Sequence, residues 1–158
     1  MEYGCIGEKL SHSFSKIIHA RLADYNYELC EIPRGGLDGF MKKADFKAIN
    51  VTIPYKQAVI PYLYYISDTA KKIGAVNTVV NKNGKLYGYN TDFSGLHALL
   101  VRQRADLKGG KVLILGSGGT SKTAAAVAED LGAKEIYRVS RSGSDGAITY
   151  DEAYKKHG

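Results

Sequence analysis

The residue types best suited to chemistry in this chain stand where a strand is expected to end and a helix to begin. Asn50 and Thr52 close an apolar run that predicts a strand over residues 48–51, and they share one face because strand side chains alternate. Lys56 follows Pro54 by two residues and is expected in the first turn of the next helix. A lysine ammonium can stabilise a developing oxyanion and deliver a proton to it. The alternative for Lys56 is a solvated helix residue.

Two hydroxyl groups stand at the start of another predicted helix. Ser13 and Ser15 flank the first of the apolar residues, and their hydroxyls could hold a carboxylate together with the free N–H groups of a helix N-terminus. The simpler interpretation is that one serine is only the helix N-cap. The apolar face of this helix is predicted by the spacing of Phe14, Ile17, Ile18 and Leu22.

A predicted hairpin carries two more candidates at its ends. Runs 76–80 and 85–89 flank an Asn-Gly pair, the dipeptide typical of a tight hairpin turn. Asn77 could be an ordinary edge residue, and Asp92, just beyond the second run, an ordinary helix N-cap. Both precede a dinucleotide-binding pattern, however, and that position favours a role where a substrate meets a nicotinamide.

That pattern is a glycine-rich turn between a strand expected over residues 111–115 and a helix expected over 122–131. Gly116 permits the tight turn, Gly118 lets the backbone approach a pyrophosphate, and Ser121 lets the helix pack closely on the strand. A glycine-rich connection without a ligand is the alternative, but the strand–turn–helix–strand context favours dinucleotide binding. The turn comprises Gly116, Ser117, Gly118, Gly119, Thr120 and Ser121.

The end of the next strand, expected over residues 135–140, indicates which dinucleotide binds. NAD sites place an acid there for the ribose 2′-hydroxyl, whereas this strand ends in Ser140, Arg141 and Ser142. A guanidinium matches a 2′-phosphate in charge and in donor geometry. A merely solvated arginine is the alternative, and the residues favour NADP.

Composition and charge indicate the general class of protein and exclude some kinds of partner. Hydrophobic residues make up 44% and charged residues 24%, as in ordinary globular proteins. The net charge is +6, but the basic residues are scattered, so no nucleic-acid partner is expected. No apolar run approaches the ~20 residues of a membrane span, and the N-terminus lacks a signal-peptide pattern, so a cytoplasmic protein without membrane partners is expected. Cys5 and Cys30 are expected to be buried free thiols, with no metal-ligand spacing.

Four stretches resemble the signatures of the shikimate dehydrogenase family, in that family's order and spacing. They are SHSFS at 11–15, NVTIPYK at 50–56, IGAVNT at 73–78 and GYNTD at 88–92. The glycine-rich turn resembles the family's variant of the dinucleotide fingerprint. Two departures are Lys16, where the family usually has proline, and the serines at 140 and 142, where it commonly has asparagine and threonine.

The resemblance implies a reaction and a set of roles. The reaction is NADPH-dependent reduction of 3-dehydroshikimate to shikimate, in the biosynthesis of chorismate and the aromatic amino acids. The implied residues are Ser13 and Ser15 for the substrate carboxylate, Asn50, Thr52 and Asn77 for ring hydroxyls, Lys56 and Asp92 as the catalytic pair, and Asp68 near the nicotinamide. An NAD-using quinate/shikimate dehydrogenase and a non-catalytic binding fragment are the alternatives.

The expected architecture is α/β, with an open substrate-binding domain over residues 1–100 followed by part of a Rossmann-type domain over 101–158. Only two strands follow Gly110, so the NADP-binding domain is expected to be incomplete and the truncated chain to turn over no substrate. The expected partner is a small-molecule substrate, and a homodimer is left open.

Overall fold

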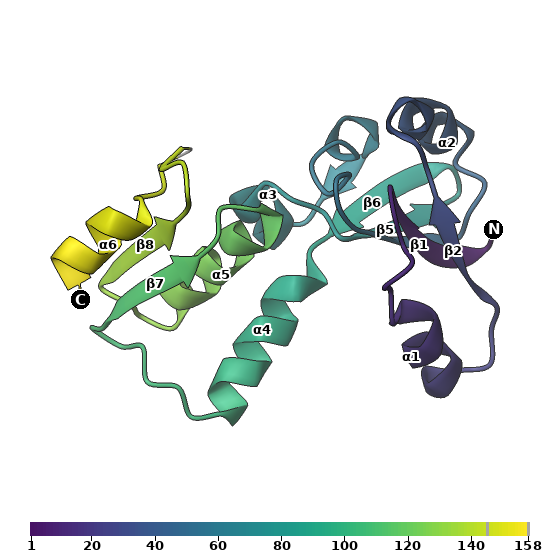
Figure 1. The fold of residues 1–158 in the computed structure, drawn as a ribbon. Helices are drawn as coiled ribbons and strands as arrows, with labels where there is room; N and C mark the ends of the chain where they lie inside the picture. Colours follow the sequence, from purple (N-terminus) through teal and green to yellow (C-terminus); the bar gives the residue numbers. More distant parts are fainter. Residues whose placement is uncertain (145, 158) are drawn as a thin grey trace. The chain divides into compact units, whose positions relative to one another are not determined.

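The chain folds into strands and helices in both of its compact units, residues 1–91 and 92–158, which confirms the predicted α/β class (Figure 1). The computed structural model describes residues 1–144 and 146–157. The strands are β1 (Tyr3–Gly7), β2 (Tyr27–Glu31), β3 (Ala48–Val51), β4 (Tyr65–Ile66), β5 (Thr78–Lys82), β6 (Lys85–Tyr89), β7 (Lys111–Leu115) and β8 (Glu135–Val139). The α-helices are α1 (Ser15–Leu22), α2 (Leu37–Lys43), α3 (Asp68–Ile73), α4 (Thr91–Arg102), α5 (Gly119–Asp130) and α6 (Tyr150–His157), with 3₁₀ turns η1 (Arg34–Gly36) and η2 (Ile60–Tyr62). None of these described helices is both long and apolar enough to cross a membrane.

The first unit is built on a six-stranded mixed sheet with the order β2-β1-β3-β5-β6-β4. Strand β1 pairs in parallel with both β2 and β3, whereas β5 runs antiparallel to β3 and to β6. Because β5 runs the other way, its first residue, Thr78, lies beside Asn50 near the carboxyl end of β3. Polar residues from two motifs that are distant in the sequence therefore meet at the carboxyl end of β3, in the middle of the sheet.

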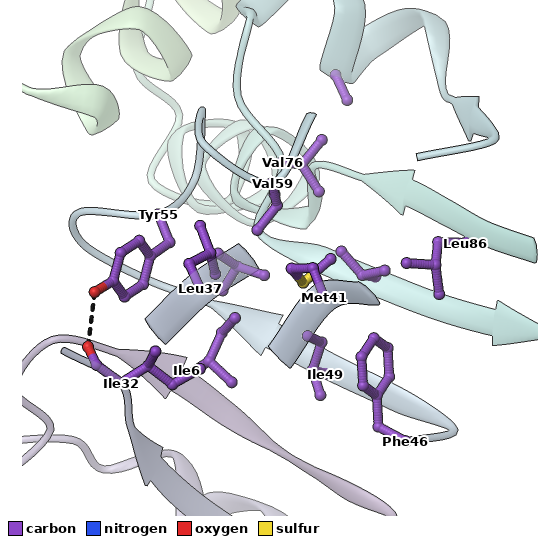
Figure 2. Close-up of a cluster of buried hydrophobic side chains, with 13 residues drawn as sticks. Ile6, Ile32, Leu37, Met41, Phe46, Ile49, Tyr55, Val59, Val76 and Leu86 are labelled. Carbon is purple, nitrogen blue, oxygen red and sulfur yellow. Dashed lines mark hydrogen bonds between the residues drawn. The ribbon is translucent and has the colours of Figure 1, made fainter. Parts of the chain in front are cut away.

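Alternation along the strands divides their side chains between two faces. Ile6, Ile49 and Val51 face α2 and join the main hydrophobic core (Figure 2). Cys5 and Asn50 are register partners one residue away from that set, so they face the opposite side. Figure 1 shows α1 and α2 on opposite sides of this sheet. One face of the sheet therefore holds the core, and the other is left for polar and aromatic side chains.

Two residues of the segment that follows β3, Tyr55 and Val59, are part of the hydrophobic core. The Tyr55 hydroxyl donates to the Ile32 carbonyl at 2.7 Å, which satisfies both groups inside the apolar cluster (Figure 2). Val59 is fully buried in the same cluster. These two anchors hold the segment that carries Lys56.

Truncating a core isoleucine should cost stability that truncating a surface isoleucine does not. Ile6 is 0% exposed and Ile18 is 53% exposed. We expect Ile6→Val to lower the free energy of unfolding by about 1 kcal/mol, because a buried methyl group is lost, and Ile18→Val to change it by much less. Urea denaturation measures both. Equal losses in the two variants would contradict this description of the core.

Two expectations for the first unit are wrong in detail. Residues 53–59 form turns rather than the helix expected after Pro54, and η2 follows directly. Pro54 and Pro61 bound this stretch, and Pro61 sits within η2; the residue before each proline disfavours helical geometry, so the chain forms turns here. Lys56 therefore lies in a turn, with its carbonyl accepting from the Val76 N–H at 2.7 Å.

The predicted helix after Ser13 is present as α1, but its cap is not a serine side chain. Phe14 occupies the N-cap position and has no capping side chain, although Ser13 Oγ, one residue earlier, accepts from the Ser15 N–H at 3.3 Å. Its apolar face is exposed: Phe14 by 72%, Ile17 by 58%, Ile18 by 53% and Leu22 by 72%. Helical spacing thus identified the helix but not the surroundings of its apolar side.

The second unit contains the expected strand–turn–helix–strand order. Strands β7 and β8 pair in parallel, with α5 as their crossover. Helix α5 begins at Gly119, three residues before the expected start, because Gly118 takes the extended N-cap conformation. An additional helix, α6, starts with a reciprocal cap in which the Glu152 N–H donates to Thr149 Oγ1 and the Thr149 N–H donates to the Glu152 carboxylate.

Candidate functional site

A cavity of about 540 Å³ opens on the polar face of the first unit, next to the carboxyl end of β1. It brings together three of the predicted substrate-binding residues, Ser13, Ser15 and Thr52. Its lining consists of Cys5, Lys9, Leu10, Ser11, His12, Ser13, Ser15 and Thr52. Hydroxyl groups and basic side chains at one hollow suit a small anionic ligand rich in hydroxyls.

Local hydrogen bonds shape the loop that supplies the serines. The Leu10 N–H donates to the Glu31 carboxylate at 2.7 Å, and the Ser13 N–H donates to the Leu10 carbonyl at 2.9 Å. The Ser15 N–H donates to Ser13 Oγ at 3.3 Å. The hydroxyl of Ser13 therefore serves the first turn of α1, while it keeps its own proton to donate.

The two predicted asparagines, Asn50 and Asn77, belong to one hydrogen-bond network at the carboxyl end of β3 and the start of β5. Asn50 Nδ2 donates to Thr78 Oγ1 at 3.3 Å, and Thr78 Oγ1 donates to Asn77 Oδ1 at 3.0 Å. Asn77 Oδ1 also accepts from the Thr91 N–H at 2.9 Å, at the start of α4. The side chain of Asn77 is thus a cap for α4 as well as part of the candidate site.

An aromatic cluster completes the network on the side of β2. The Tyr27 hydroxyl donates to Asn50 Oδ1 at 2.6 Å, and the Tyr27 ring stacks on the His19 ring with centroids 3.8 Å apart. Burial raises the pKa of Tyr27, the nearby Cys5 thiol and Tyr25 add to the rise, and a hydrogen bond from Ser15 works against it. The phenol therefore stays protonated and acts as a donor near neutral pH.

The remaining polar candidates, Lys56, Asp68 and Asp92, lie at turns and helix starts. Burial raises the pKa of the Cys5 thiol, and the positive charge of Lys56 offsets only part of that rise. The Lys56 ammonium thus acts electrostatically on Cys5, a residue of the cavity lining. Asp68 is the first residue of α3, a helix capped by Ser67. Its side chain is 99% exposed, and its Oδ1 lies 3.7 Å from Lys71 Nζ. Asp92 lies in the first turn of α4. In the described residues, no group of three or more His, Cys, Asp or Glu side chains could hold a metal ion.

The second unit has its own cavity, of about 480 Å³, between the glycine-rich turn and the end of β8. It is lined by Gly116, Ser117, Ser140, Arg141, Ser142 and Tyr150. The predicted turn and the predicted strand end thus meet at one hollow. Gly116 has φ of 125°, which favours glycine, and a Cβ added at Gly118 or Gly119 would meet open space. The backbone beside the N-terminus of α5 is therefore accessible to a dinucleotide phosphate, and these residues fit one.

Several hydroxyl groups at or near this second cavity form hydrogen bonds within the protein. Ser121 is buried, and its hydroxyl donates to the Gly118 carbonyl at 2.6 Å, which holds the turn in shape. Ser140 Oγ accepts from the Gly143 N–H at 3.1 Å. Thr120 is exposed at the start of α5, and Ser142 is an exposed residue of the cavity lining whose hydroxyl also hydrogen-bonds to Ser144 Oγ at 2.8 Å.

Sequence reasoning missed four residues of these sites: Tyr27, Thr78, Thr91 and Tyr150. Thr78 and Thr91 directly follow Asn77 and Asn90 in two of the quoted stretches, so the stretches themselves held that signal. Tyr27 and Tyr150 carry no local signal, because their partners are distant in the sequence.

Comparison with known proteins gives these two cavities a context. Residues 5–79 match the family described as the shikimate dehydrogenase substrate binding domain. The NADP(+) shikimate dehydrogenase of Clostridium beijerinckii is 44% identical over 158 residues, which cover 95% of this chain and 58% of that protein. Shikimate dehydrogenase 1 from Peptoclostridium difficile superimposes with a TM-score of 0.86 at 39% identity, over 96% of this chain and 63% of that one. Shikimate 5-dehydrogenase from Thermus thermophilus, solved with NADP(H) and shikimate, gives 0.82 at 29% identity, over 94% of this chain and 62% of that one.

Fold and site together define an α/β protein with a hydroxyl-lined cavity in one unit and a dinucleotide-type turn in the other. Residues 5–79 match the substrate binding domain of the shikimate dehydrogenase family, and most of the chain is similar to shikimate dehydrogenases, which confirms the resemblance of its four sequence stretches. It spans 58% of the length of the Clostridium beijerinckii relative.

Proposed function

We propose that this chain carries the shikimate site and the NADP-binding turn of a shikimate dehydrogenase, which reduces 3-dehydroshikimate to shikimate with NADPH. The observation that supports this most strongly is the meeting of three motifs on one face of the first unit. Ser13, Ser15 and Thr52 line a common cavity, and Asn50 and Asn77 are linked through Thr78 beside it.

Each group has a proposed role toward the substrate. The hydroxyls of Ser13 and Ser15, at the start of α1, hold the carboxylate by donating to its oxygens. Asn50, Thr52 and Asn77 hold the ring hydroxyls. A site built to pair every polar group of its ligand rejects an analogue that lacks one of them, because a buried group is then left unpaired.

Lys56 is the proposed proton donor for reduction. As an ammonium it donates a hydrogen bond to the ketone oxygen, stabilises the negative charge that develops there and transfers a proton to it. Asp92 is proposed to orient the reacting hydroxyl and to favour the charged form of Lys56. NADPH, when bound, supplies the hydride.

Cofactor choice is assigned to the second cavity. Arg141 is proposed to bind the 2′-phosphate of NADP, and Ser140 and Ser142 to support it with hydroxyls. The turn from Gly116 to Ser121 is proposed to receive the pyrophosphate at the start of α5. Asp68 is proposed to lie near the nicotinamide. Assignment of residues 1–100 to the substrate and 101–158 to NADP, a homodimer and a cytoplasmic location stay predictions.

Two measurements test this proposal. Isothermal titration of the chain with shikimate should show one saturable site, and cyclohex-1-ene-1-carboxylate, which lacks the three hydroxyls, should bind far more weakly. A chimera that joins this chain to the rest of the Clostridium beijerinckii relative should oxidise shikimate with NADP⁺. The proposal fails if the folded chain binds neither compound, or if both bind equally well.

A further inference from the structure

We propose that Tyr27 is a positioning residue: its hydroxyl fixes the Asn50 amide so that Asn50 presents N–H, rather than its carbonyl oxygen, to the substrate. The inference deepens the proposed function and rests on it for the identity of the ligand. It follows from the direction of the hydrogen bonds that link the asparagines, because each bond in that network determines the next.

The direction of the network is set at its far end by a backbone group. The Thr91 N–H can only donate, and it lies 2.9 Å from Asn77 Oδ1, so this atom must be the carbonyl oxygen. The same oxygen accepts from the Thr78 hydroxyl at 3.0 Å. Thr91 Oγ1 is a more distant neighbour of the Thr78 hydroxyl, at 3.5 Å, so the single proton of Thr78 is assigned to Asn77 and Thr78 Oγ1 offers lone pairs to a third group.

Asn50 is the group that uses those lone pairs. Its Nδ2 donates to Thr78 Oγ1 at 3.3 Å, which turns its Oδ1 toward Tyr27. Tyr27 then has to donate, and its hydroxyl lies 2.6 Å from that oxygen. A phenol can donate or accept, so Thr78 selects the flip of the Asn50 amide, and the short bond from Tyr27 then stabilises the amide in that flip.

The orientation of the two asparagine amides determines which hydrogen-bonding groups a ligand can meet. Among the described residues, Asn50 Nδ2 has Thr78 as its acceptor and Asn77 Nδ2 has Thr91 Oγ1, at 3.0 Å. Each amide nitrogen carries a second N–H, while both amide oxygens already accept from the protein. The second N–H of each amide therefore lets Asn50 and Asn77 donate to a ligand oxygen, while Asn50 Oδ1, which can accept two bonds, keeps its remaining lone pair on the side turned toward Tyr27.

The ring of Tyr27 is held in place independently of its hydroxyl. It stacks on His19 at an interplanar angle of 12°, and His19 Nδ1 contacts the Tyr25 hydroxyl. The Tyr27 side chain is also buried, with 5% of its surface exposed. Phenylalanine would keep the stacking and the burial, so Tyr27→Phe removes only the hydroxyl, together with its hydrogen bonds to Asn50 and Ser15.

The first test compares shikimate binding in matched variants of the chain by isothermal titration. We expect Tyr27→Phe to raise the Kd for shikimate by about tenfold. Tyr62→Phe also removes a phenol hydrogen bond, to Asp38 at 3.0 Å and away from the network, and should leave the Kd unchanged. In an Asn50→Ala background, Tyr27→Phe should have little further effect, because its route of action is gone. Full additivity of the two substitutions, or an unchanged Kd in Tyr27→Phe, would overturn the inference.

A second measurement separates this inference from the proposed function. The side-chain NH₂ signals of Asn50 in ligand-free protein, identified by their loss in Asn50→Ala, should shift in Tyr27→Phe, while those of the surface residue Asn26 stay in place. Unmoved Asn50 signals would refute the role of Tyr27 whatever the protein binds. If these signals shift but wild-type protein binds no shikimate, the positioning role holds and the proposed substrate is wrong.

Discussion

Lys56→Ala should lower the turnover of shikimate by roughly 10²–10⁴-fold, the loss typical of a removed acid–base group. The test uses the chimera with the Clostridium beijerinckii relative, assayed with shikimate and NADP⁺. Binding of shikimate should change much less than turnover, because the ammonium is proposed to act mainly on charge that develops in the transition state.

A matched lysine serves as the control for this substitution. Lys42 is exposed on α2 and pairs with Asp38 at 2.9 Å, so Lys42→Ala removes the same charge far from the cavity lining and should leave turnover near the wild-type value. A near-normal kcat in Lys56→Ala, or an equal loss in both variants, would remove Lys56 from the proposed mechanism.

Arg141→Ala should weaken NADP⁺ binding by about 10–100-fold, the value of one or two charge-assisted hydrogen bonds, and should leave NAD⁺ binding almost unchanged. Only NADP⁺ carries the 2′-phosphate that the guanidinium is proposed to bind. The readout is the ratio of the two dissociation constants, measured by fluorescence or calorimetry on the same preparation.

Arg102, exposed near the end of α4, provides the control for general charge. Arg102→Ala should leave the ratio unchanged. Equal weakening of both dinucleotides by Arg141→Ala would contradict the role given to Arg141. A wild-type preference for NAD⁺ would instead favour the NAD-using quinate/shikimate dehydrogenase that the sequence left as an alternative.

Features that depend on local chemistry could be predicted from the sequence. The hairpin of β5 and β6 follows from Asn83 and Gly84, whose φ angles of 53° and 83° are those that this dipeptide tolerates. The turn at Gly116 likewise requires the positive φ that glycine allows. The cap of α6 was readable in the same way, since threonine three residues before glutamate is a known helix start.

Features that depend on distant contacts could not be predicted. Tyr27 and Asn50 are 23 residues apart, and Asn50 and Thr78 are 28 apart. No local sequence pattern therefore predicts the hydrogen bonds between them. The turn that carries Lys56 is decided by the burial of Tyr55 and Val59 in the core as much as by its prolines. Local propensity gives way to tertiary packing at such places.

The central claim, that the first unit holds shikimate, is tested most directly by an NMR titration of the isotope-labelled chain. Addition of shikimate should shift backbone and side-chain amide signals at residues 11–15, at Asn50 and Thr52, and at Asn77, with one common dissociation constant. Signals of the outer turn at Asn83 and Gly84 should stay in place. Shifts confined to other parts of the first unit, or no saturable shifts at all in folded protein, would contradict the site described here.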